Sequence, residues 1–76
     1  MRKFVNLKIP EHCHPLVRRL FVEMNKQQIG LLDMADRSGV NKNTIHDWKT
    51  RSMPNLQNIE ACYSVLGLRL TVAHAE

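Results

Sequence analysis

The stretch from Leu31 to Thr50 has the sequence LLDMADRSGVNKNTIHDWKT. Gly39, in its middle, tolerates the left-handed backbone conformation in which many helices end. Asn41, two residues later, is a residue type favoured at helix N-caps. These two residues predict a helix over residues 31–38, a tight turn, and a second helix over residues 41–49.

Two short helices hold a fixed angle when the side chains between them fit. Ala35 is small and lies where we expect the second helix to cross the first. The glycine of the turn and the apolar side chains of both helices complete the predicted framework, which consists of Met34, Ala35, Gly39, Val40, Ile45 and Trp48. With these residues turned inward, the outer face of the second helix is left free.

Two further helices are predicted on either side of this stretch. Apolar residues recur every three or four positions from Leu16 to Met24, and Pro15 suits a first helical turn. Asn55 is a second good N-cap, and the helix after it ends at Gly67. Its expected apolar stripe is Leu56, Ile59, Cys62, Tyr63 and Leu66.

Both ends of the chain alternate apolar and polar residues, which is typical of β-strands. The two segments are residues 4–9 and 68–73. The expected fold is therefore mainly α, with four helices between two short terminal strands. Because 76 residues can build only one core, we expect residues 1–76 to form a single domain.

Composition excludes several classes of protein. No run of residues approaches the roughly twenty apolar residues that cross a bilayer. The first residues lack the apolar segment of a secretory signal, and two cysteines are few for a secreted domain of this size. These observations predict a cytoplasmic protein without a membrane partner.

Charge is unevenly distributed. Residues 1–30 carry six basic side chains against two acidic ones, and residues 37–51 carry four against Asp47. The formal net charge is +4. This distribution favours a polyanionic partner.

The run from Leu31 to Lys49 resembles the helix-turn-helix of the Cro/phage-repressor (XRE-type) family. Ala35, Gly39, the apolar Val40, Ile45 and Trp48 fall at the positions that the family's pattern requires. The likeness extends from about Pro15 to Gly67. It implies a lambda-repressor-like domain and a sequence-specific transcriptional regulator, such as a repressor of a phage or mobile element.

The resemblance implies which residues would meet double-stranded DNA. Residues 41–49 would be the recognition helix in the major groove. Base contacts are expected from Lys42, Asn43, His46 and Asp47, whose side chains can pair with guanine, adenine or cytosine edges. Phosphate contacts are expected from Thr44, Lys49, Thr50 and Arg51.

One position departs from the family's pattern. The family commonly begins the supporting helix with a glutamine that contacts a phosphate, where this chain has Leu31. The alternatives for that contact are the backbone N–H groups at the start of this helix, and the side chains of Gln27 or Gln28.

A metal site or an enzyme is not expected. His12, Cys13 and His14 are adjacent on one segment and match no zinc-ligand spacing. The chain shows no phosphate-binding glycine loop, no paired carboxylates and no nucleophile with a base, so neither cofactor nor catalysis is predicted.

A single small module contacts few bases, so we expect a homodimer on a palindromic operator with half-sites about 10 base pairs apart. The apolar residues of the C-terminal strand, Leu68, Leu70 and Val72, would form the dimer contact, with residues 4–9 adding to the same sheet or pairing within one subunit. The alternative function is an antitoxin or antiactivator whose main task is to bind another protein.

Overall fold

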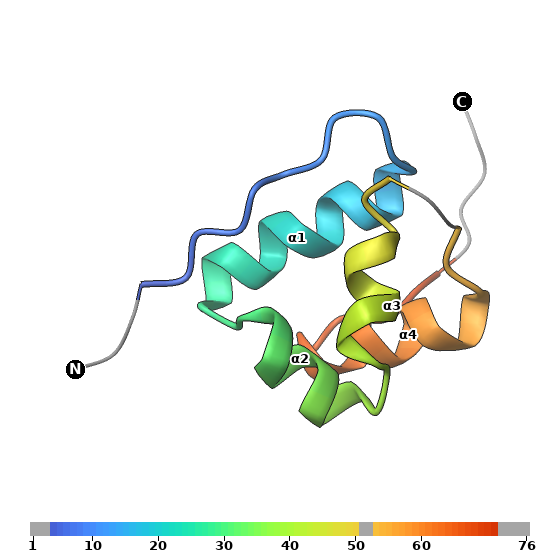
Figure 1. Cartoon of the computed structure of the whole chain (residues 1–76). Helices are drawn as coiled ribbons and strands as arrows, with labels where there is room; N and C mark the ends of the chain where they lie inside the picture. Colours follow the sequence, from blue (N-terminus) through green and yellow to red (C-terminus); the bar gives the residue numbers. More distant parts are fainter. Residues whose placement is uncertain (1–3, 51–52, 72–76) are drawn as a thin grey trace.

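The computed structural model describes residues 4–50 and 53–71, and most of this length is α-helical (Figure 1). The helices are α1 (Pro15–Gln27), α2 (Leu31–Ser38), α3 (Lys42–Asp47) and α4 (Leu56–Val65). The prediction of a mainly helical fold with four helices is confirmed. None of the helices in this part of the chain is long and apolar enough to cross a membrane.

The helix ends have local causes. The N-cap His14 accepts a hydrogen bond from the Leu16 amide through Nδ1 at 3.1 Å, and the N-cap Asn55 accepts one from the Asn58 amide at 2.8 Å. Gly67 follows α4 with a φ of 76°, a conformation that suits glycine. Side-chain caps satisfy amides that have no partner inside the helix.

The core lies between all four helices. Helix α2 packs against both α3 and α4, and α1 packs against α4. The buried apolar residues are Val17, Leu20, Phe21, Met24, Ile29, Met34, Val40, Ile45, Trp48, Ile59, Cys62, Tyr63 and Leu66. Leu56 was expected in this core but is 68% exposed, because it occupies the first turn of α4. Burial raises the pKa of the Cys62 thiol, although a hydrogen bond with Ser38 opposes the shift, so the thiol stays neutral.

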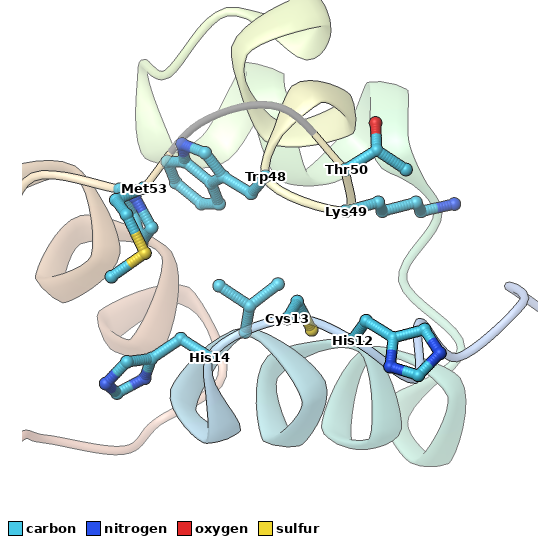
Figure 2. Close-up of a pocket in the computed structure, with 9 residues that line it drawn as sticks. His12, Cys13, His14, Trp48, Lys49, Thr50 and Met53 are labelled. Carbon is cyan, nitrogen blue, oxygen red and sulfur yellow. The ribbon is translucent and has the colours of Figure 1, made fainter.

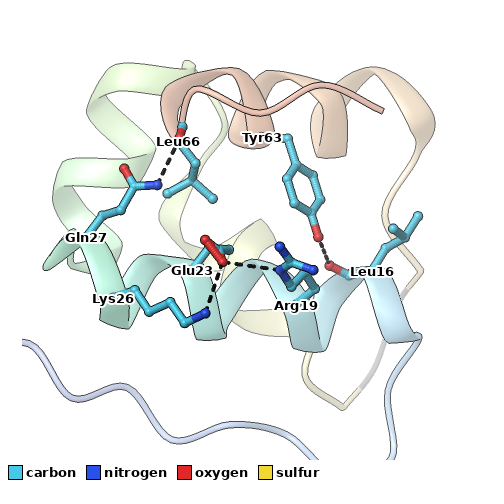
Figure 3. A network of polar contacts seen from close by, with 7 residues as sticks. All are labelled: Leu16, Arg19, Glu23, Lys26, Gln27, Tyr63 and Leu66. Atoms are coloured by element: carbon cyan, nitrogen blue, oxygen red, sulfur yellow. Dashed lines mark hydrogen bonds and ion pairs between the residues drawn. The ribbon is translucent and has the colours of Figure 1, made fainter. Parts of the chain in front are cut away.

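Polar contacts join α1 to the end of α4 (Figure 3). The Tyr63 hydroxyl donates to the Leu16 carbonyl at 2.6 Å, and Gln27 Nε2 donates to the Leu66 carbonyl at 2.9 Å. On the same side of α1, Glu23 accepts from Arg19 at 3.3 Å and lies 3.8 Å from the Lys26 ammonium. The bonds that Tyr63 and Gln27 donate join α1 to α4, whereas the ion pairs of Glu23 lie within α1.

The segment before α1, residues 4–14, runs alongside that helix (Figure 1). We refer to it as the N-terminal arm. Two side-chain amides of α1 and its C-cap hold its backbone. Asn25 accepts from the Leu7 amide at 2.7 Å and donates to the Leu7 carbonyl at 2.9 Å. Gln28 does the same for Val5, at 2.7 and 3.0 Å.

These amide pairs explain why the predicted strand over residues 4–9 does not form. The alternation is present, since Val5, Leu7 and Ile9 are half-buried while residues 6 and 8 are exposed. A β-strand also needs a neighbouring strand as its hydrogen-bonding partner. In the arm, side chains of α1 and its C-cap occupy that role, and the backbone stays extended without a sheet.

The predicted strand over residues 68–73 is likewise absent from residues 68–71. Leu68 and Leu70 are half-buried against the core of their own chain, and the Leu68 amide donates to the Tyr63 carbonyl at 2.9 Å. Packing of a single extended segment accounts for the alternation. Val72, the third residue expected at the dimer contact, lies outside the described residues.

The amide pair at Asn25 generates a testable prediction. Asn25→Ala removes two hydrogen bonds, each with a net value of about 0.5–1.5 kcal/mol, and should lower the free energy of unfolding by about 1–3 kcal/mol. It should also speed hydrogen exchange of the Leu7 amide. The control, Asn6→Ala, removes an exposed amide of the arm and should change neither quantity. A Leu7 amide that stays equally protected in Asn25→Ala would contradict the assignment.

Candidate nucleic-acid interface

Helices α2 and α3 are joined by a three-residue turn, residues 39–41. Gly39 adopts a φ of 79°, and its amide donates to the Ala35 carbonyl at 3.0 Å. The Ser38 hydroxyl accepts from the Val40 amide at 3.1 Å. Asn41 then caps α3, accepting from the Asn43 amide at 2.8 Å. Each end of the turn is thus fixed by its own hydrogen bonds.

The side chains between the two helices are closely packed. Met34 and Ile45 are fully buried, and Val40 and Trp48 are exposed by only 6% and 3%. Ala35 is half-buried against this cluster. Close packing resists small displacements, so α3 is held rigidly against α2.

The outer face of α3 carries polar side chains. The four residues predicted to contact bases, Lys42, Asn43, His46 and Asp47, are all exposed. Thr44 is half-buried at the edge of this face. Within the described residues, the structure therefore brings the predicted base-contacting residues together on one side of one short helix.

The second helix is shorter than the sequence predicts. It ends at Asp47 rather than Lys49, and the next three residues form a tighter turn. The amides of Trp48, Lys49 and Thr50 each donate to the carbonyl three residues earlier, at 3.2 Å. Such tightening is common in the last turn of a helix. Thr50 is exposed at its end, and Arg51 lies outside the described residues.

Lys49 has a partner that the sequence does not reveal. Its ammonium lies over the ring of Phe21, 5.0 Å from the ring centroid. A cation near the face of an aromatic ring is attracted by the negative charge of that face. Lys49 is half-buried, and its contact with the ring restricts the positions that its ammonium adopts.

The arm lies opposite this turn. Figure 2 shows His12, Cys13 and His14 facing Trp48, Lys49 and Thr50 across a pocket of about 190 Å³. The imidazoles of His12 and His14 point away from each other, on either side of Cys13. His14 caps α1, and the Cys13 sulfur lies 3.9 Å from the Pro10 carbonyl. No cluster of three metal-ligating side chains occurs among the described residues.

Both glutamines suggested as substitutes for the missing family contact are engaged elsewhere. Gln27 donates to the Leu66 carbonyl, and Gln28 holds Val5 of the arm. Leu31 itself is half-buried against the core. Gln28 could make a phosphate contact only by releasing a bond, because both Nε2 hydrogens are used, whereas Gln27 Nε2 keeps one hydrogen beyond its bond to Leu66.

The positive φ at Gly39 generates a second prediction. A Cβ at this position would meet no atom within 4 Å, so the cost of a substitution comes from the backbone alone. Gly39→Ala should lower the free energy of unfolding by about 1–2 kcal/mol. Gly39→Asn should cost clearly less, because asparagine tolerates the left-handed region. Urea unfolding measures both values, and equal losses would mean that a contact and not the backbone is responsible.

Comparison of the chain with protein-family models, with curated proteins and with solved structures found no match. The resemblance of residues 31–49 to the Cro/phage-repressor family therefore stays a prediction from those residues themselves.

Proposed function

We propose that the chain is a sequence-specific DNA-binding transcriptional regulator with a lambda-repressor-like helix-turn-helix. In this proposal α2 is the supporting helix and α3 is the recognition helix that enters the major groove. The protein binds a palindromic operator as a homodimer.

One observation carries the proposal. A closely packed pair of helices buries the large apolar side chains of its inner face, while four hydrogen-bonding side chains extend from the outer face of α3. The major groove accepts an α-helix, and its base edges offer donors and acceptors to such side chains. Solvation alone is a sufficient role for any one of these residues, but together they form a surface that can distinguish base pairs.

Each of the four side chains has a distinct capability. Asn43 can pair with both N6 and N7 of adenine, and Lys42 can donate to guanine. Asp47 can accept a hydrogen bond from cytosine N4. It also repels phosphates, so it disfavours alignments of α3 on the DNA that bring Asp47 close to the backbone. His46 can donate to a base or a phosphate.

The homodimer follows from the size of the recognition helix. Six residues in α3 contact only a few base pairs, too few for tight specific binding by one subunit. A twofold pair of subunits doubles the contacts and requires an operator of matching symmetry. Leu68 and Leu70 remain candidates for the contact, although each already packs against its own core.

A second candidate function is binding of another protein, as an antitoxin or antiactivator does. Three large apolar side chains favour it, since Leu32 and Met53 are each 71% exposed and Leu56 is 68% exposed. Exposed apolar side chains of this size are candidate anchors at protein interfaces. The base-reading face of α3 would then be dispensable.

The central experiment selects duplexes from a random DNA pool and titrates the protein onto them at several salt concentrations. We expect an enriched palindrome with half-sites about 10 base pairs apart, bound as a dimer. The logarithm of the affinity should fall with the logarithm of the salt concentration by about 0.9 per phosphate contacted. Failure to bind any duplex, even at low salt, would reject the regulator and leave the protein-binding alternative.

Asn43→Ala tests base reading directly. The Asn43 side chain is exposed, so its loss should not affect folding. We expect the preference for adenine at one position of each half-site to fall by about five- to 150-fold, which corresponds to about 1–3 kcal/mol. The matched control is Gln57→Ala, an exposed amide on α4. Uniform weakening on all sequences would show that Asn43 does not read a base.

A further inference from the structure

The N-terminal arm and the turn after α3 line a second pocket, which shares His12, Lys49 and Thr50 with the one in Figure 2. It is an open pocket of about 470 Å³, lined by residues 8–12 of the arm and by Lys49 and Thr50. The base contacts proposed for α3 make no use of it. Because Thr50 follows the last turn of α3, the pocket adjoins the end of the proposed recognition helix.

The side chains around this pocket favour an anion. Lys8 and Lys49 contribute two ammonium groups, His12 an imidazole and Thr50 a hydroxyl. Glu11 is the one acidic side chain that lines it, so positive charge prevails. These donors come from two segments about forty residues apart in the sequence, and only the fold brings them together.

Both walls of the pocket are held in place. On one wall, the ring of Phe21 fixes the Lys49 ammonium. On the other, Asn25 and Gln28 hold the backbone of Leu7 and Val5, directly before Lys8. The Lys49 ammonium and the backbone that carries Lys8 are thus positioned before a ligand binds, which lowers the entropy lost on binding.

We propose that this pocket binds a phosphate of the DNA backbone beside the bases that α3 reads. The proposal rests on the function proposed above and extends it, because it makes the arm a part of the interface. Lys8 and Lys49 are then phosphate-binding residues, and Asn25 is a positioning residue that acts through the arm. A phosphate contact at this place anchors α3 at its C-terminal end.

Three single variants test the proposal on the selected operator. Lys8→Gln removes one cation from the pocket. Lys26→Gln is its matched control: it removes one exposed lysine, while Arg19 remains paired with Glu23. Asn25→Ala releases the arm without removing any charge. Circular dichroism confirms that each variant is folded under the binding conditions.

The readout is the salt dependence of binding. Because each subunit of the dimer loses one contact, Lys8→Gln should reduce the slope by about 1.8, and at 0.1 M salt it should weaken binding by about sixty-fold on every sequence alike. Asn25→Ala should reduce the slope similarly, although all the cations are present. Lys26→Gln should keep the wild-type slope.

Several results would overturn the proposal, and they differ from failure of the proposed function. If the wild-type protein binds its operator with an Asn43-dependent preference and Lys8→Gln keeps the full slope, the pocket binds no phosphate. Equal effects of Lys8→Gln and Lys26→Gln would mean that only the net charge matters. A wild-type slope in Asn25→Ala would reject the positioned arm, whereas absence of any DNA binding by the wild type would reject the proposed function itself.

Discussion

Helix α2 packs its inner face against α3 and α4 at once, and Met34 on that face is completely buried. A chain of this size has too little interior for a separate core under each helix pair, so one shared set of contacts must orient them all. The angle of α3 relative to α2 and the position of α4 are therefore not independent. Any function that depends on the outer face of α3 depends first on this packing.

Sequence patterns predicted the helices well because their ends are determined locally. Gly39, Asn41, Asn55 and Gly67 all occupy the capping or turn positions expected from their residue types. Only α3 is shorter than predicted, since its last turn tightens. The predicted terminal strands do not form among residues 4–9 and 68–71, for a physical reason. Alternation reports which side chains are buried, and it does not report which group accepts the backbone hydrogen bonds.

The sequence likewise predicted one part of the candidate site and not another. Periodicity separated the inward residues of α3 from the outward ones, and the structure places Ile45 in the core and Lys42, Asn43, His46 and Asp47 at the surface. Nothing in the sequence, by contrast, relates Lys49 to Phe21 or brings Lys8 near Lys49. These contacts join distant segments, so no local pattern could have predicted them.

Gln28 shows what the fold requires of the arm. It is the non-glycine residue in the described chain with a left-handed backbone, at a φ of 59°, where glycine or asparagine is usual. Its side chain reaches the backbone of Val5. A glycine has no side chain to make this contact, and the side chain of an asparagine is one methylene shorter. The unfavourable backbone is thus accompanied by two hydrogen bonds that depend on the long amide.

The amides of Asn25 and Gln28 contact backbone atoms of the arm, and every residue except proline offers the same atoms at those positions. Attachment of the arm therefore depends little on which residue types occupy the exposed positions next to Val5 and Leu7. Positions 6 and 8 can gain or lose charge while the arm stays in place. Mutation at these positions offers a route by which the affinity of the surface for a charged partner can change over evolution without loss of the fold.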